Sequence, residues 1–254
     1  MDVPRYAREK SESGIYHIMI RGINRQDIFE DNDDRQRFIE TIKKYKTVSK
    51  YEVHGYCLMS NHVHMLIKEV EEPISMAIKR ICGSYVYWYN MRYNRCGHLF
   101  QERYKSEIVE DEGYYLTVLR YIHQNPVNAG LSTHVKEYEW SSYREYIGKT
   151  EITDIDLALE LFSDDRRKAV ELFDKYMNEE NDDKCLEYSK KSAKTDKEVR
   201  GYFVAAGVNN ISDLQHQEKF KRDEIIRVVK SIEGVSIRQL SRITGIPKSV
   251  IDRM

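Results

Sequence analysis

Residues 60–67 read SNHVHMLI, and this run contains the clearest structural pattern in the chain. Side chains alternate between the two faces of a β-strand, so His62 and His64 share one face. The other face carries apolar side chains that can be buried, namely Val63, Met65 and Ile67. The pattern predicts a half-buried strand with two imidazoles side by side, at a spacing suited to one shared cation. The alternative is two ordinary hydrogen-bonding histidines.

The segments around this strand predict a small α+β domain. Three further segments are rich in β-branched and aromatic residues and predict strands, the last of them a strand or an extended hairpin: residues 15–21, 51–59 and 98–109. Ser60 and Asn61 form a tight connection, so the strands on either side are expected to pair as a hairpin. Apolar residues at helical spacing predict three helices: 31–49, 74–93 and 112–125. The order β-α-β-β-α-β-α is typical of helices packed on an antiparallel sheet.

The helix predicted over residues 112–125 carries a tyrosine and an amide one turn apart. Tyr121 and Asn125 lie on one border of its apolar stripe. A tyrosine at that position can face a sheet that bears histidines; the alternative is a packing role for Tyr121 and a terminating role for Asn125. Because the residue before a proline disfavours the α region, the helix is expected to end before Pro126.

Composition excludes several classes of protein. The 254 residues include 41 basic and 42 acidic side chains, and charged residues make up 33% of the chain. No run approaches the roughly 20 apolar residues that span a bilayer, and the first residues do not resemble a secretory signal. The four cysteines are far apart, as expected for reduced thiols. We therefore expect a cytoplasmic protein that does not bind membranes.

Charge is distributed unevenly, with an acidic middle and a basic tail, which suggests separate modules. We predict an α+β domain over residues 1–149, an acidic helical connector and linker over 150–197, and a helical C-terminal domain over 198–254. The last 36 residues carry 9 basic and 4 acidic side chains, so this region can approach a polyanion such as DNA.

The C-terminal region has the pattern of a helix-turn-helix. Ser236 and Gln239 predict a capping box, Gly245 a turn, and Pro247 the start of a second helix. Three basic residues here are candidates for contacts with duplex DNA: Arg238, Arg242 and Lys248. The alternative is a pair of helices with a purely structural role.

Five blocks of this sequence resemble one known family. They are MSNHVH (59–64), YIHQNPVNAGL (121–131), RGINRQDIF (21–29), LFQERYK (99–105) and WSSY (140–143). The blocks follow the family's order and span about residues 14–146. The chain resembles the HUH single-tyrosine transposases, and within them the REP-associated tyrosine transposases. The resemblance implies a ferredoxin-like antiparallel sheet with helices packed on it.

The resemblance also implies a reaction, the metal-assisted cleavage and rejoining of single-stranded DNA. Tyr121 would be the nucleophile that forms a 5′-phosphotyrosine, and His62 and His64 the paired ligands of a divalent cation, Mg²⁺ or Mn²⁺. Relatives often complete the ligand set with a polar residue one turn beyond the tyrosine, frequently Gln; Asn125 occupies that position here, and Gln124 is a less well-placed substitute. Imidazole ligands also suit Zn²⁺, so the identity of the metal stays open.

The implied partner is single-stranded or hairpin DNA, with duplex DNA a further candidate for the C-terminal region. Four basic residues lie in the resembling blocks and could contact phosphates or serve as solvated surface: Arg21, Arg25, Arg103 and Lys105. Relatives include dimers that exchange the tyrosine helix, so a homodimer is a further expectation, as is association with the bacterial nucleoid. Two other functions remain open: a non-catalytic DNA-binding regulator on a transposase-like scaffold, and a metal phosphodiesterase that works through water.

Overall fold

The structure is a computed structural model, which describes residues 9–186, 194, 196–208, 211, 214, 217–232 and 234–254. The chain divides into two compact units, Met1–Glu187 and Tyr188–Met254. Among the described residues, no helix combines the length and the apolar character that crossing a membrane requires.

The first unit is built on a four-stranded antiparallel sheet with the order β2-β3-β1-β4. Its strands are β1 (Ile15–Arg21), β2 (Glu52–Leu58), β3 (His62–Lys68) and β4 (Lys105–Ile108). The β2–β3 hairpin and the antiparallel sheet confirm the prediction. The edge strand β4 is shorter than the segment predicted over residues 98–109, and Phe100 instead forms an isolated bridge with Gly22.

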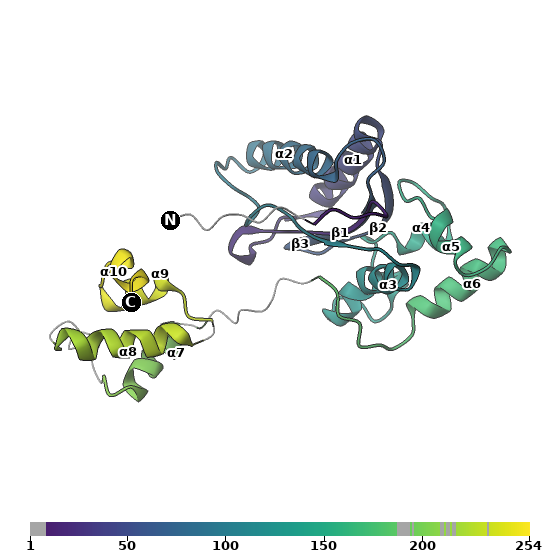
Figure 1. Cartoon of the computed structure of the whole chain (residues 1–254). Coiled ribbons are helices and arrows are strands. Elements are labelled where there is room, and N and C mark those ends of the chain that lie inside the picture. The colour runs from purple at the N-terminus through teal and green to yellow at the C-terminus, as the bar shows by residue number, and fades with distance from the viewer. Residues whose placement is uncertain are drawn as a thin grey trace. The chain divides into compact units, whose positions relative to one another are not determined.

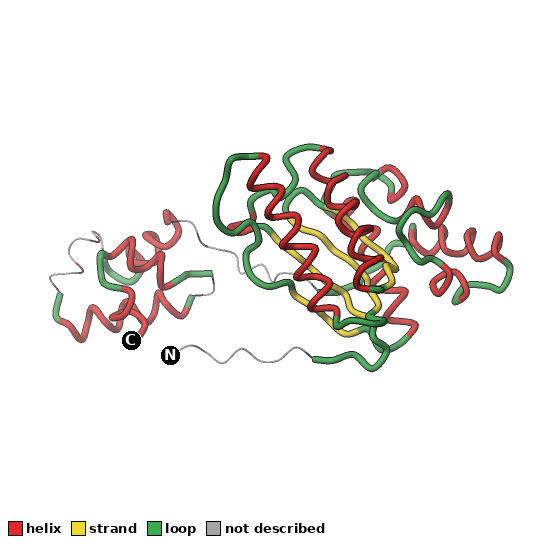
Figure 2. The backbone as a smooth tube through the Cα atoms, turned by 90° about the horizontal axis from the view of Figure 1, so that it is seen from above, coloured by secondary structure: helices red, strands yellow, loops and turns green. Residues whose placement is uncertain are grey.

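Helices cover both faces of this sheet. On one face lie α1 (Asn32–Ser49) and α2 (Ile74–Arg92), and on the other lies α3 (Glu112–Asn128) (Figure 1). Figure 2 shows that α1 and α2 lie over the strands. A capping box between Asp31 and Asp34 starts α1, which satisfies N–H groups that the helix itself leaves unpaired. The apolar side of β3 is buried beneath α1 and α2, as the alternation of its side chains predicted.

Helix α3 continues beyond the end that the sequence predicted. Pro126 lies inside it, and the last helical residue is Asn128. A proline near the end of a helix removes only its own N–H, and Pro126 is buried, so packing opposes termination at that point. The turn that follows contains Gly130 at φ +70°, a left-handed conformation that glycine adopts without a steric penalty. The expected end at Asn125 is therefore wrong.

Short helices complete the first unit. They are η1 (Ile23–Arg25), η2 (Val135–Glu137), α4 (Tyr143–Ile147), α5 (Asp156–Glu160) and α6 (Arg166–Met177). The core beneath α3 includes buried residues of α4, α5 and α6. Phe173 of α6 stacks on Tyr146 of α4, with ring centroids 4.3 Å apart and planes at 10°.

The predicted connector over residues 150–197 differs from this arrangement. Helices α5 and α6 belong to the first compact unit, because their apolar side chains are buried against α3 and α4. Residues 178–186 have no helix or strand. Residues 187–193 and 195 of the predicted linker lie outside the described residues, and α7 already begins at Asp196.

The second unit is helical. It contains α7 (Asp196–Ala205), α8 (Lys219–Ser231), α9 (Ile237–Thr244) and α10 (Lys248–Asp252) around a small apolar core. Ser236 accepts the N–H of Gln239, but the Gln239 side chain donates to Lys194 O and to Asp196, so only half of the predicted capping box forms. Gly245 ends α9 in the left-handed conformation. The DNA-binding role of this helix pair stays a prediction.

Candidate active site

Two histidines of β3 project from the face of the sheet that α3 covers. His64 is fully buried and His62 is half-buried. Their ring centroids are 5.1 Å apart and their planes are nearly perpendicular, at 85°. This face is also lined by Cys57, Met59 and Leu66, which pack in the core beneath α3. The histidines therefore lie side by side, opposite the apolar face of their own strand.

Helix α3 places the ring of Tyr121 against this pair. The ring centroid lies 5.6 Å from that of His64, in an edge-to-face arrangement at 82°. Only 6% of Tyr121 is exposed. The tyrosine and the histidines thus come from the same polypeptide, and no partner chain is needed to bring them together.

A third histidine, His17 of β1, belongs to the same cluster, and the sequence analysis did not identify it. Its Nε2 lies 3.0 Å from Nδ1 of His64, and its ring centroid lies 5.9 Å from that of Tyr121. Its Nδ1 faces Oε2 of Glu107, on β4, at 3.8 Å. The sequence did offer one indication of a functional role, because His17 interrupts the apolar run of residues 15–20. Only the β1–β3 register, however, brings it beside His64.

Burial keeps the imidazoles of His64 and His17 neutral. It lowers the pKa of His64 well below its usual value, and the neighbouring His17 and His62 lower it further. Burial likewise lowers the pKa of His17, although Glu107 opposes this shift. The contact with His17 lowers the pKa of Glu107 and favours the carboxylate. Neutral imidazoles keep a lone pair, which is the form that binds metal ions.

Backbone hydrogen bonds join the segments around the histidine end of the sheet. Gly22 N donates to Asn61 O at 2.9 Å, and Ile23 N donates to Leu99 O at 2.9 Å. A Cβ atom at Gly22 would lie 2.2 Å from the carbonyl oxygen of Gln26, so only glycine fits there. Three blocks that are distant in sequence therefore meet beside the histidines.

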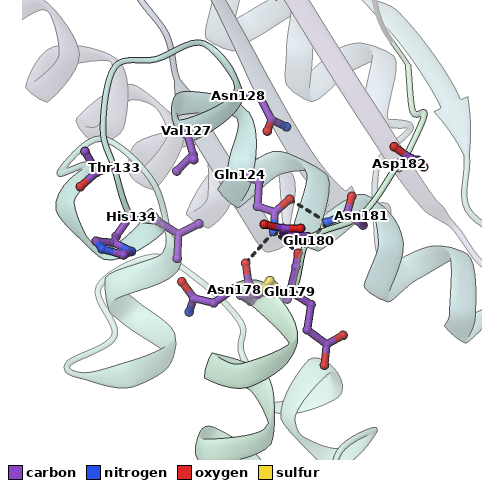
Figure 3. A pocket seen from close by; sticks show the side chains of 12 residues that line it. Gln124, Val127, Asn128, Thr133, His134, Asn178, Glu179, Glu180, Asn181 and Asp182 are labelled. Atoms are coloured by element: carbon purple, nitrogen blue, oxygen red, sulfur yellow. Dashed lines mark hydrogen bonds between the residues drawn. The ribbon is translucent and has the colours of Figure 1, made fainter.

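The two amides after Tyr121 differ in their surroundings. Asn125 lies one turn further along α3 and is half-buried. Gln124 is already engaged: its Oε1 accepts Asn181 Nδ2 at 2.8 Å, and its Nε2 donates to the carbonyls of Met177 and Glu179, both at 2.9 Å (Figure 3). Gln124 would have to break these bonds to reach a metal ion, so Asn125 is the better candidate ligand.

The segment over residues 178–186 forms a strap along α3. Arg120 of α3 makes a bidentate pair with Asp183, at 2.7 and 3.0 Å, and its guanidinium lies 4.1 Å from the ring centroid of Tyr176. At the end of the strap, Leu186 N donates to Glu107 Oε2 at 3.1 Å. The strap therefore links the tyrosine helix to the edge strand that carries Glu107.

A pocket opens where this strap meets the C-terminal end of α3 (Figure 3). Its lining includes the carboxylates of Glu179, Glu180 and Asp182. Neither Tyr121 nor His64 lines it. Carboxylates repel the phosphates of DNA, so this pocket is not a suitable place for a DNA strand.

The side chains of this site can fill only part of the coordination sphere of a divalent cation. His64 Nε2 is buried without a hydrogen-bond partner in the described part of the chain, as a ligand nitrogen would be. Among the same residues, no group of three or more His, Cys, Asp or Glu side chains could hold a metal ion. His62 and His64 therefore fit two positions of a coordination sphere, which an amide oxygen or the oxygens of a bound phosphate would complete.

The basic candidates fall into two groups. In the first unit, Arg21 pairs with His62 across β1 and β3, and Lys105 pairs with Met19, which itself pairs with His64. Directly paired residues share a face of the sheet, so both cations border the histidines. Arg25, at the end of η1, and Arg103, in the loop before β4, are exposed. The three candidates of the second unit are exposed: Arg238, Arg242 and Lys248. Arg242 forms an ion pair with Asp196 at 2.6 Å.

Comparison with known proteins assigns the domain that carries this cluster. Residues 10–125 match the family described as "Transposase IS200 like". This match covers 116 of the 254 residues, so the first unit is similar to the IS200-like transposases. The IS200-like segment contains the whole sheet, the three clustered histidines and Tyr121.

One solved structure agrees with the fold of the IS200-like domain. A REP-associated tyrosine transposase bound to a REP hairpin has a TM-score of 0.50 and 17% identity, over 61% of this chain and 96% of that chain. At this identity the likeness shows the fold alone. A putative transposase from Deinococcus radiodurans R1 has a TM-score of 0.35 and 16% identity, over 47% of this chain and 96% of that chain. The curated proteins contain no match.

We expect the stability of the IS200-like domain to fall in mild acid. Burial lowers the pKa of His123, which contacts Ser142 Oγ at 2.8 Å, to about 3. The unfolded chain binds this proton with a pKa near 6.5. The contribution of His123 is therefore complete above about pH 6.5 and is lost as the pH falls toward 3, by up to about 1.4 kcal/mol per pH unit.

Urea unfolding at pH 7.5 and pH 5.5 checks this expectation. Tryptophan fluorescence reports on the first unit, which contains both tryptophans of the chain, Trp88 and Trp140. Between these two pH values, the His123→Gln variant should lose about 1.4 kcal/mol less than the wild type. Equal losses would show that protonation of His123 does not drive the change.

Proposed function

We propose that this protein is a transposase that cleaves and rejoins single-stranded DNA through a covalent intermediate on Tyr121. One observation carries the proposal: the ring of Tyr121 lies 5.6 Å from that of His64 and on the same side of the sheet as His62. A regulator without catalytic activity has no chemical need for a tyrosine beside this histidine pair. A hydrolase that uses water has no need for the tyrosine.

The proposed reaction exchanges one phosphodiester for another. The phenol oxygen of Tyr121 forms a bond to phosphorus, and the bond from phosphorus to the 3′ oxygen breaks, which leaves a 5′-phosphotyrosine and a free 3′-hydroxyl. The phenol loses one proton and the 3′ oxygen gains one, so the number of protons is unchanged. A later 3′-hydroxyl attacks the phosphotyrosine, releases Tyr121 and restores the DNA backbone, so no external energy source is required.

The side chains of β3 would hold the metal ion of this site. His62 and His64 would supply nitrogen ligands, and Asn125 is the proposed third ligand. When bound, a divalent cation such as Mn²⁺ or Mg²⁺ polarises the scissile phosphate and offsets its developing charge. A phenol has a pKa near 10 in water, so its ionisation needs assistance, to which a neighbouring cation would contribute.

We expect the protein to bind Mn²⁺ at least about ten times more tightly than Mg²⁺ in the absence of DNA. Imidazole nitrogens suit Mn²⁺, whereas Mg²⁺ prefers oxygen ligands and loses water reluctantly. Titration of Mn²⁺ followed by electron paramagnetic resonance, with competition by Mg²⁺, measures the ratio. His64→Ala should abolish tight binding, and His98→Ala, which alters an exposed histidine outside the cluster, should leave it unchanged. Equal affinity for the two ions would contradict the proposed ligands.

The substrate we propose is hairpin or other single-stranded DNA. The solved relative named above was bound to a REP hairpin, and the site here is bordered by cations. Arg21 and Lys105 would contact phosphates nearest the histidines, and Arg25 and Arg103 would contact phosphates further out. Such contacts hold the strand in position without reading its sequence.

The second unit is proposed to bind duplex DNA. Arg238 and Arg242 on α9 and Lys248 at the start of α10 are exposed, and exposed cations can neutralise phosphates. In this proposal α9 and α10 form a helix-turn-helix that holds the chain near its target. Association with the nucleoid and formation of a homodimer are further parts of the proposal.

A single assay separates the proposed function from its alternatives. Labelled single-stranded hairpin DNA is incubated with the protein and Mn²⁺, and the products are separated under denaturing conditions. A labelled band at the mass of a protein–DNA adduct supports the phosphotyrosine. Cleavage without an adduct would indicate hydrolysis by water, and binding without cleavage under all metal conditions would indicate a regulator.

A further inference from the structure

Each histidine of β3 has its Nδ1 atom held by a side chain outside the proposed metal position. His62 Nδ1 lies 2.6 Å from Asn61 Oδ1, and His64 Nδ1 lies 3.0 Å from His17 Nε2. A neutral imidazole carries one proton, and the hydrogen bond at one nitrogen determines which nitrogen keeps the lone pair. The chemistry of these outer partners therefore decides which nitrogen of each histidine can bind a cation.

Asn61 sets the tautomer of His62. Its Nδ2 donates to the carbonyl oxygen of Arg25 at 3.2 Å. A carbonyl oxygen can only accept, so this contact fixes the orientation of the Asn61 amide. Oδ1 then faces His62 Nδ1 and requires an N–H there. The lone pair of His62 is consequently on Nε2.

A buried relay from Glu107 sets the tautomer of His64. Among the described residues, His17 Nδ1 is buried without a hydrogen-bond partner, and it faces the Glu107 carboxylate at 3.8 Å. A carboxylate attracts an N–H and repels a lone pair, so the proton of His17 is on Nδ1. His17 Nε2 must then accept a proton from His64 Nδ1. This leaves the lone pair of His64 on its buried Nε2, which also has no hydrogen-bond partner in the described residues.

We propose that Asn61, His17 and Glu107 are positioning residues that hold His62 and His64 as Nδ1–H tautomers and thereby direct two Nε2 lone pairs to one divalent cation. Ligating histidines commonly donate their second nitrogen to a carboxylate or a carbonyl, which fixes the ring and strengthens the ligand. Here the carboxylate acts on His64 through an intervening imidazole. The metal part of this inference rests on the proposed function, whereas the tautomers can be measured without metal.

Nuclear magnetic resonance of the metal-free protein tests the tautomers directly. In protein labelled with ¹⁵N-histidine, long-range ¹H–¹⁵N correlations distinguish a protonated nitrogen from one with a lone pair. We expect His62 and His64 both to be protonated at Nδ1 in the wild type. A proton on Nε2 of His64 would overturn the relay, whatever the behaviour of the metal.

Variants test whether the relay acts on the metal ligand. Glu107→Ala removes a carboxylate that we place outside the metal's ligand set, and it should give His64 a mixture of tautomers and weaken Mn²⁺ binding by about tenfold. His17→Phe should have at least as large an effect. The matched control is Glu52→Ala on the opposite edge strand, where Glu52 Oε2 lies 3.3 Å from the buried His54 in a similar pair. The control should change neither the His64 tautomer nor the affinity for Mn²⁺.

The outcomes separate this inference from the proposed function. If His17→Phe fails to fold, Glu107→Ala still decides, because Glu107 is partly exposed at the edge of the sheet. An unchanged His64 tautomer and unchanged Mn²⁺ affinity in Glu107→Ala would overturn the relay even if the wild type forms the DNA adduct. A wild type that binds no Mn²⁺ but shows the expected tautomers would count against the metal site and leave the relay supported.

Discussion

Replacement of Tyr121 with phenylalanine is expected to abolish the covalent protein–DNA adduct and to lower strand cleavage by at least about 10⁴-fold. Removal of the nucleophile of a covalent enzyme typically has effects of this order or larger. The ring of phenylalanine can keep the edge-to-face contacts of Tyr121 with His64 and His17. The loss should therefore appear in the reaction rate, while folding and DNA affinity change little. Quantification of labelled adduct and of cleaved strand over time measures it.

Tyr115→Phe provides the matched control for this variant. Tyr115 lies on the same helix, is equally buried, and has its hydroxyl 2.9 Å from His54 Nδ1, outside the histidine cluster. This change should lower stability by about 1 kcal/mol but leave adduct formation within a few-fold of the wild type. An adduct that survives in Tyr121→Phe would show that another residue is the nucleophile. Equal loss in both variants would indicate that damage to α3, and not missing chemistry, is responsible.

Phe173→Ala is expected to lower the free energy of unfolding of the first unit by about 3–5 kcal/mol. Phe173 is fully buried and is in ring contact with His123, Tyr143 and Tyr146. Its removal leaves a cavity behind α3. The loss of stability therefore combines the lost transfer free energy of the aromatic ring with the cost of the cavity. Urea unfolding followed by tryptophan fluorescence measures the change in the first unit.

Phe220→Ala is the control for this second prediction. Phe220 is 77% exposed on α8 of the second unit, and its loss should change the fluorescence transition by less than about 0.5 kcal/mol. A loss below about 1 kcal/mol for Phe173→Ala would contradict the packing of α6 against α3. It would then favour an α+β domain that ends at residue 149, as the sequence predicted.

The sheet was the most predictable part of this protein. The alternation in β3 places two histidines on one face and three apolar residues on the other, and turn residues between two strand-like segments predict the hairpin. The end of α3 was not predictable from the Asn125–Pro126 pair, because burial of Pro126 against the core outweighs its local preference. The helices between residues 150 and 177 were predicted, but as part of a connector; their place in the first unit depends on the burial of Phe173 against α4, which leaves no pattern in the sequence.

Only those residues of the candidate site that belong to a pattern within one segment could be predicted from the sequence. Tyr121 was expected to face the histidines from its place on a helical stripe. His17 and Glu107 could not be assigned, because they join the cluster through the pairing of β1 with β3 and β4. Strand register depends on the whole sheet, so two residues that meet across it leave no spacing pattern in the sequence.

The strap over residues 178–186 has a consequence for how two copies of this chain could cooperate. A bidentate arginine–aspartate pair and a set of amide contacts clamp α3 to its own polypeptide. Exchange of α3 with a second molecule would first have to break these contacts. New contacts in the swapped dimer would have to offset the free energy lost. The arrangement thus favours a reaction centre that is complete within each chain, so that a homodimer would contribute two separate centres and not two halves of a shared one.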